Sequence, residues 1–238
     1  MSDVTSNPAD FPRSVLYARP DSLESLNAAA QLGADALLVN LEKVAPEELP
    51  AARQVLSDFL SQAGRSGSRA WLKLTLDQHD LDIAAISGPL DYIMVPDATL
   101  TNLANVAALL DVQETAAGLP AGSVRLNALV EDAVGLLSLR EIASMPRVQK
   151  LGIGRVDLMA QLRMTCDPEG PEMTRFLVDL VVASAAAGID PPLASLYQQA
   201  DNDEGLRKTT ARLHSIGFFG RTAVYPQHIA GLNEIFAA

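Results

Sequence analysis

Two acidic residues, Glu131 and Asp157, follow predicted strands and could hold a metal ion. Glu131 comes after the apolar run 124–129, and Asp157 comes after Gly152-Ile153-Gly154. Two carboxylates, completed by waters and substrate oxygens, are a usual way of holding Mg²⁺, which gives up its waters reluctantly. Such an ion could polarise a carbonyl group and stabilise an enolate. The alternative is that both acids cap helices, because helix N-termini favour Asp and Glu.

Further polar side chains stand at the ends of two earlier predicted strands. Asn40 and Glu42 fall on the same side of their strand, because side chains alternate between the faces. Lys73 shares a face with Trp71. A strand lysine in apolar surroundings can form a Schiff base with a carbonyl substrate, and Lys73 is the candidate for that chemistry.

Eight short apolar or β-branched runs would carry these residues, separated by segments with helical periodicity. Eight parallel strands alternating with helices favour a closed (β/α)₈ TIM barrel over an open sheet. The active site of such a barrel lies at the carboxyl ends of its strands. The predicted strands are Val15–Ala18, Ala36–Leu41, Ala70–Leu74, Tyr92–Val95, Val124–Leu129, Lys150–Gly154, Leu193–Leu196 and Arg221–Tyr225.

Helix signals lie between the predicted strands. Asp21 and Glu24 are spaced as a capping pair for the first helix. Pro46-Glu47-Glu48 forms an acidic first turn for the second. Two later helices are expected from Pro171 to Gly188 and from Asp203 to Gly217, since proline favours helix starts and glycine favours helix ends.

Length and composition indicate a single domain. The chain has 238 residues, of which 48% are hydrophobic, enough to bury one large core. We expect residues 1–12 to be a disordered start and residues 13–238 to form the barrel. The Gly/Ser stretch Gly64–Ser68 is short, and we expect a loop there.

The charge of the chain excludes some partners. The net charge is −11, which repels phosphate backbones and anionic lipids, so we expect neither a nucleic acid nor a membrane surface as partner. The longest apolar stretch is too short to span a bilayer. A single cysteine, Cys166, allows no internal disulfide and favours a cytoplasmic location. The expected partner is a small anionic substrate.

An ordered set of motifs carries a family resemblance. The segments are Arg13-Ser14-Val15-Leu16-Tyr17, Gly33-Ala34-Asp35-Ala36, Asn40-Leu41-Glu42-Lys43, Pro46-Glu47-Glu48, Leu129-Val130-Glu131-Asp132-Ala133-Val134-Gly135, Gly154 to Asp157, Asp203-Glu204-Gly205-Leu206 and Gly217-Phe218-Phe219-Gly220-Arg221. In this order they resemble the citrate lyase beta-subunit and 2-keto-diacid aldolase family, which includes malyl-CoA lyases. The resemblance runs from about Arg13 to Phe236.

The resemblance implies a Mg²⁺-dependent carbon–carbon lyase or aldolase. Its substrate would be a hydroxy-diacid or the CoA thioester of one, and the chain would assemble as a homotrimer or hexamer. Glu131 and Asp157 match the family's metal ligands, and Lys73 falls where an arginine holds the substrate carboxylate. Glu42 would orient a metal-bound water or a substrate hydroxyl, with Asn40 supporting it.

Positive charge near the substrate could come from two further residues. Arg13 and Arg155 could each lie near the anionic acid. The alternative for both is an ion pair with a surface carboxylate.

Several family residues are replaced in this chain. The family has an acid at the position of Lys43 and a lysine at that of Asp97, so we expect an inverted ion pair between them, or two independent solvated changes. The number of replacements leaves open a catalytically altered barrel that acts as a binding or regulatory subunit.

Overall fold

The computed structural model describes residues 11–62 and 68–237. Most of the predicted disordered start and of the predicted Gly64–Ser68 loop lies outside the described residues. Phe11 is described, and its ring packs edge-on against Phe219 with centroids 5.6 Å apart.

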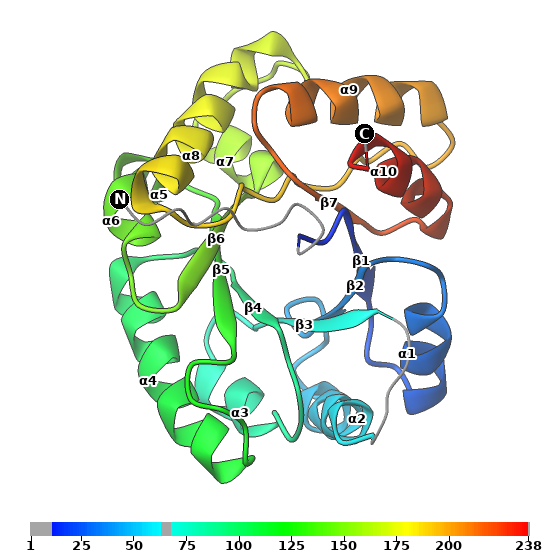
Figure 1. Cartoon of the computed structure of the whole chain (residues 1–238), viewed down its shortest axis with the longest axis vertical. Coiled ribbons are helices and arrows are strands. Elements are labelled where there is room, and N and C mark those ends of the chain that lie inside the picture. The colour runs from blue at the N-terminus through cyan, green and yellow to red at the C-terminus, as the bar shows by residue number, and fades with distance from the viewer. Residues whose placement is uncertain (1–10, 63–67, 238) are drawn as a thin grey trace.

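Seven parallel strands form one curled sheet, with the helices on its outer side (Figure 1). The sheet order is β6-β5-β4-β3-β2-β1-β7. The strands are β1 (Ser14–Ala18), β2 (Ala36–Asn40), β3 (Arg69–Lys73), β4 (Tyr92–Val95), β5 (Arg125–Val130), β6 (Val148–Ile153) and β7 (Arg221–Ala223). The predicted α/β class and parallel, barrel-like sheet are therefore confirmed.

The predicted strand Leu193–Leu196 does not form as a strand. Leu193 makes a single parallel bridge to Gly152 of β6, and Ala194 makes one to Arg221 of β7. This segment thus links the two edge strands of the curled sheet. Pro191 and Pro192, which have no N–H to donate to a ladder, come directly before it.

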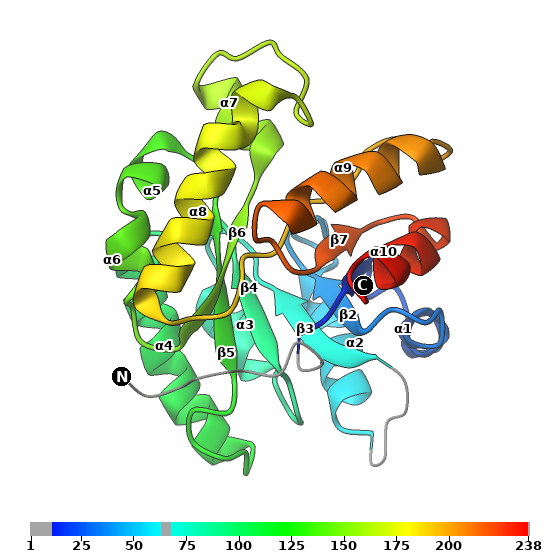
Figure 2. The same cartoon turned by 45° about the horizontal axis from the view of Figure 1, so that its top comes forward.

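The helices follow the strands in alternation. They are α1 (Leu23–Ala30), α2 (Leu49–Leu60), α3 (His79–Ala84), α4 (Leu100–Ala116), α5 (Ala133–Leu137), α6 (Leu139–Ala143), α7 (Arg155–Gln161), α8 (Thr174–Ala187), α9 (Asp203–Ser215) and α10 (Ile229–Ile235), with short 3₁₀ turns η2 (Pro171–Met173) and η3 (Pro226–His228). Figure 2 shows α8 running beside β6, and α9 passing over β7. Within the described ranges, no helix is both long and apolar enough to cross a bilayer.

The signals for the two later helices are confirmed, and those for the two earlier ones are wrong in detail. Pro46, Glu47 and Glu48 form a turn before α2, which begins at Leu49 and has no acidic residue in its first turn. Gly188 ends α8 in the left-handed region, at φ +70°, and Gly217 follows α9 at φ +104°. The predicted cap of the first helix is shifted, because Ser22 and Ser25 form the capping box of α1. A serine hydroxyl can cap a helix as well as an aspartate can, so the spacing of Asp21 and Glu24 was not decisive.

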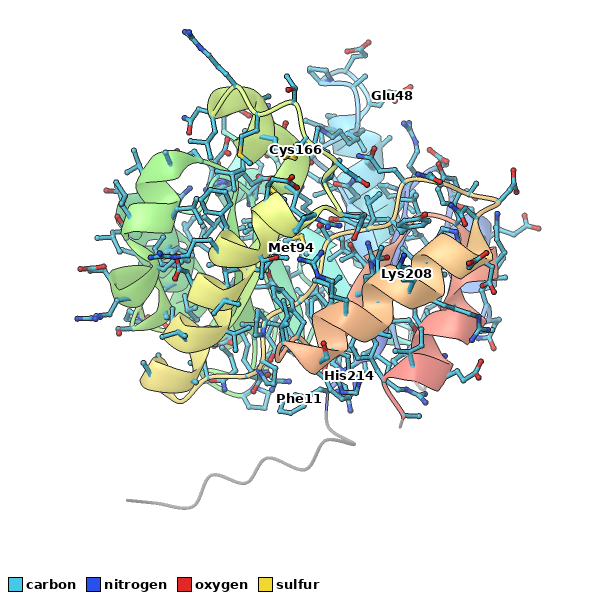
Figure 3. The ribbon with its side chains drawn as sticks, turned by 90° about the horizontal axis from the view of Figure 1, so that it is seen from above. Phe11, Glu48, Met94, Cys166, Lys208 and His214 are labelled. Carbon is cyan, nitrogen blue, oxygen red and sulfur yellow. The ribbon has the colours of Figure 1, made fainter. Side chains whose placement is uncertain are left out.

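Two apolar layers hold the sheet in place. The larger lies between the sheet and the helices, and the smaller fills the concave side. The concave layer comprises Val15, Ala36, Leu38, Trp71, Tyr92, Met94, Leu129 and Leu193. In Figure 3, Met94 lies near the centre, Glu48 and Cys166 mark the carboxyl rim of the strands, and Phe11 marks the amino rim.

Candidate active site

A cavity of about 560 Å³ opens at the carboxyl ends of the strands. Polar side chains from β2, β3, β5 and α7 meet there above the apolar concave layer. The polar residues lining it include Tyr17, Asn40, Glu42, Lys43, Lys73, Glu131, Arg155, Asp157, Asp167, Glu169, Ser195, Gln198 and Gln199. This is the end of the sheet at which barrel enzymes place their active sites.

An ion pair between Lys73 and Glu42 forms one side of the cavity. Lys73 Nζ lies 2.8 Å from Glu42 Oε2, and the two side chains are only 7% and 10% exposed. The parallel register sets Asn40 of β2 opposite Lys73 of β3. Asn40 Oδ1 accepts a hydrogen bond from the Glu42 backbone N–H at 3.1 Å. The strand pairing and this turn therefore bring the acid and the base together.

Glu131, directly after β5, is a buried carboxylate of the cavity. Burial raises its pKa to about 6, against the charge of Lys73 and a hydrogen bond from the Asp97 N–H, which lower it. That bond, 3.1 Å long, reaches Oε2 and is the carboxylate's one hydrogen bond within the described part of the chain. The side chain also lies directly against Gly154. A buried carboxylate with so few donors favours a cation as neighbour.

Two further acids extend this negative side. Asp157 lies exposed in the first turn of α7 and lines the cavity. Asp97 follows β4, and its pKa is raised by burial and by the nearby carboxylates of Asp132, Asp157 and Glu42. Such mutual repulsion between acids is relieved when a cation binds among them.

The donor set at this rim fits Mg²⁺. Mg²⁺ usually takes one or two carboxylates from the protein and keeps several waters. Glu131 and Asp157 line one cavity, which has room for the ion and its waters. Among residues 11–62 and 68–237, no group of three or more His, Cys, Asp or Glu is arranged to hold a metal. The site therefore differs from an all-protein cage such as that of a structural zinc ion.

Six of the seven candidate residues line this cavity: Asn40, Glu42, Lys73, Glu131, Arg155 and Asp157. Arg13 is not brought together with them. It precedes β1 at the opposite rim, where its guanidinium pairs with Asp35 at 2.8 Å. That ion pair is the alternative we gave for Arg13, and we do not carry it into the site.

The expected ion pair between Lys43 and Asp97 does not form. Lys43 Nζ lies 3.6 Å from Glu42 Oε2, and its side chain is 72% exposed. The exposed Lys43 ammonium thus pairs with Glu42, the preceding residue, and not with Asp97.

Arg155 lines the cavity, but its ion pair is with Glu169 and not with Glu131 or Asp157. Its Nη2 pairs with Glu169 Oε1 at 2.6 Å, and its Nε donates to Ser195 Oγ at 2.6 Å. Arg221, fully buried, reaches the same Glu169 oxygen at 2.5 Å. These contacts join the loop before η2 to the segment after Ala194. The positive charges of Arg155 and Arg221 are therefore balanced by Glu169 within the protein.

Sequence reasoning missed three residues of the cavity region. Glu169 lies in a Pro/Gly loop whose spacing gives no signal. The fully buried Arg221, within a run predicted as a strand, could have been suspected of needing an acidic partner. Tyr17 shares a strand face with Val15, so the alternation could have placed it in the cavity.

A family model described as HpcH/HpaI aldolase/citrate lyase matches residues 13–226, and the chain belongs to this family. The resemblance found in the sequence is thereby confirmed.

Similar proteins carry related names. A (3S)-malyl-CoA thioesterase of Cereibacter sphaeroides is 29% identical over 230 residues, which cover 94% of this chain and 77% of that protein. The citrate lyase subunit beta of Escherichia coli (strain K12) is 26% identical over 233 residues, with 94% and 76% covered.

Solved structures show the same fold. The citrate lyase beta subunit from M. tuberculosis, complexed with oxaloacetate and magnesium, matches with a TM-score of 0.78 at 23% identity, over 98% of this chain and all of that one. CitE from Mycobacterium tuberculosis, in complex with magnesium, acetoacetate and coenzyme A, matches at 0.76 and 24% identity, with 97% and 82% covered.

Proposed function

We propose that the protein is a Mg²⁺-dependent carbon–carbon lyase or aldolase. Its substrate would be a hydroxy-diacid or the CoA thioester of one, and it would release a 2-oxo acid or an acyl product. The observation that carries the proposal is that one cavity is lined by the acids Glu131 and Asp157 together with the Lys73–Glu42 ion pair. Such a cavity can take a divalent cation and an organic anion together.

Each residue would have a distinct role. Glu131 and Asp157 would hold Mg²⁺, which supplies a Lewis acid that polarises a carbonyl oxygen when it is bound. Lys73 would bind the substrate carboxylate as a point charge. Glu42, whose carboxylate pairs with Lys73 and whose backbone N–H donates to Asn40 Oδ1, would orient a substrate hydroxyl or a water.

The finer architecture and assembly also belong to this proposal. We infer a complete (β/α)₈ barrel in which Leu193 and Ala194 take the place of a strand between β6 and β7, as their bridges support. A homotrimer or hexamer and a cytoplasmic location remain predictions, from the family resemblance and from the single cysteine respectively.

The test is product release from hydroxy-diacids and from their CoA thioesters, measured separately as 2-oxo acid and as free thiol. We expect Mg²⁺-dependent 2-oxo acid release that EDTA abolishes. Glu131→Gln should lose Mg²⁺ binding in calorimetry. Asp132→Asn is the matched control: it removes a neighbouring charge, but asparagine can keep the cap that Asp132 makes to the Gly135 N–H.

Other outcomes would replace the proposal. Release of thiol without a 2-oxo acid would indicate a thioesterase, as the Cereibacter relative is named. A borohydride-trapped adduct on Lys73 would indicate Schiff-base chemistry. Stoichiometric binding to another subunit, without turnover, would indicate a binding or regulatory role.

A further inference from the structure

Tyr17 places a hydroxyl inside the cavity with no strong partner. It stands on β1 and packs against the apolar layer of the concave side. Its one hydrogen bond among the described residues runs from the hydroxyl to Met94 Sδ, at 3.5 Å. A thioether sulfur is a weak acceptor, so a good donor is left nearly unused in a region that lines the cavity.

The surroundings of the hydroxyl keep its proton in place. Burial raises the pKa of Tyr17 far above its ordinary value, and the negative charges of Glu42 and Glu131 raise it further. The phenol is therefore a hydrogen-bond donor at neutral pH and not a base.

Neither nearby carboxylate accepts the phenol proton. Glu42 Oε2 pairs with Lys73 Nζ, and Glu131 Oε2 accepts a hydrogen bond from the Asp97 N–H. The hydroxyl thus lies close enough to both acids to sense their charge, but it is bonded to neither. An oxygen of a bound ligand would be a far better acceptor than the sulfur of Met94.

We propose that Tyr17 is a substrate-contacting residue, whose hydroxyl donates a hydrogen bond to a carboxylate or carbonyl oxygen of a 2-oxo acid bound between Lys73 and Glu131. This inference rests on the proposed function, which supplies the bound 2-oxo acid. It adds a neutral donor beside the charged groups of Lys73, Glu42 and Glu131. A neutral hydroxyl makes a stronger hydrogen bond to a charged oxygen of the ligand than to a neutral one. It adds no net charge to the site when no ligand is bound.

The experiment measures pyruvate binding in the presence of Mg²⁺ by calorimetry. Tyr17→Phe removes the hydroxyl and keeps the ring. We expect it to bind pyruvate roughly 10-fold more weakly, the effect of losing one hydrogen bond to a charged oxygen. The affinity for Mg²⁺ alone should not change. The matched control is Tyr225→Phe, because Tyr225 is not among the residues that line the cavity. Its hydroxyl already donates to the backbone carbonyl of Gln198, at 3.3 Å.

A spectroscopic readout separates contact from packing. The chain has four tyrosines, so ¹³Cζ-tyrosine labelling gives few resonances, and the one missing from Tyr17→Phe belongs to Tyr17. We expect that resonance to shift on addition of pyruvate with Mg²⁺ and to stay in place with Mg²⁺ alone.

The outcomes distinguish this inference from the proposed function. If the parent and Tyr17→Phe bind pyruvate equally and the Tyr17 resonance stays in place, the inference is overturned while the proposed function stands. If the parent binds no pyruvate with Mg²⁺ and turns over no hydroxy-diacid or thioester, both are overturned.

Discussion

Gly154 lies directly against the side chain of Glu131: a Cβ added to this glycine would clash with Oε1 and stand 2.6 Å from Cγ. Glycine at this point of the chain therefore lets the buried carboxylate reach the cavity. The contact joins the end of β5 to the residue that precedes α7, on which Asp157 stands. The side chain of Glu131 is thus packed against the chain segment that carries Asp157, the other predicted metal ligand.

We predict that Gly154→Ala displaces the Glu131 carboxylate and weakens Mg²⁺ binding by roughly 10-fold or more, as changes to the support of a metal ligand do. Calorimetry with Mg²⁺ measures the effect. Gly152→Ala is the control, because the atoms nearest to its Cβ would be Asn127 Oδ1 at 2.9 Å and Leu129 Cδ1 at 3.1 Å, and none belongs to Glu131. Equal loss of Mg²⁺ affinity in both variants would show that crowding in general is responsible.

We predict that Glu131→Gln stabilises the metal-free protein by about 1–2 kcal/mol at pH 8, since the raised pKa of about 6 reports the cost of burying the charge. The sign follows from linkage. A carboxyl pKa raised in the folded state means that the folded protein binds more protons between the ordinary value of 4.5 and about 6. The free-energy cost of burying the Glu131 charge is thus fully present above about pH 6 and absent below the ordinary carboxyl pKa of 4.5.

Urea unfolding of the parent and of Glu131→Gln, from pH 4 to pH 8 with EDTA, measures this dependence. The stability difference should shrink as the pH falls through 6, and Mg²⁺ affinity in the parent should fall over the same range because protons compete with the metal. A constant difference across this range would contradict the assignment. Glu141→Gln, on the exposed surface of α6, is the control and should change stability by less than about 0.5 kcal/mol.

We predict that Lys73→Met lowers turnover by roughly 100-fold and stability by about 3 kcal/mol. The variant removes the charge that would hold the substrate carboxylate, and it leaves Glu42 nearly buried without its close partner. Lys43→Met is the matched control, because Lys43 approaches the same oxygen of Glu42 but is exposed, and exposed pairs contribute little. Similar effects of the two variants in kinetics and urea unfolding would contradict the assignment.

We predict that Glu169→Gln costs about 3–5 kcal/mol of stability, because it leaves the guanidinium of Arg221 buried without a counter-charge. Burial alone would raise the pKa of Glu169, but Arg155 and Arg221 outweigh it and lower the value. The stabilisation should therefore be present above the ordinary carboxyl pKa and be lost as the pH falls below it. Urea unfolding measures the loss, and the exposed Glu172→Gln should change stability by less than about 0.5 kcal/mol.

Much of the element order could be predicted because its signals are local. The strands β2 and β4 are continuous buried runs, as parallel strands covered on both faces must be. The run at Leu193–Leu196 carries the same signal but forms only single bridges. The carbonyls of Ser195 and Leu196 accept hydrogen bonds from Arg221 and Arg155 side chains, which the local pattern does not reveal.

The sequence by itself determined which residues end the strands, and so it brought Asn40, Glu42, Lys73, Glu131 and Asp157 to one rim. Strand periodicity and chain direction are local properties, and parallel strands place all their carboxyl ends on one side. Only the tertiary structure decided which charges meet. Lys73 pairs with Glu42, Arg13 with Asp35, and Arg155 with Glu169. Such pairing depends on distances of a few ångströms between side chains far apart in the chain, and these distances exist only once the sheet has curled.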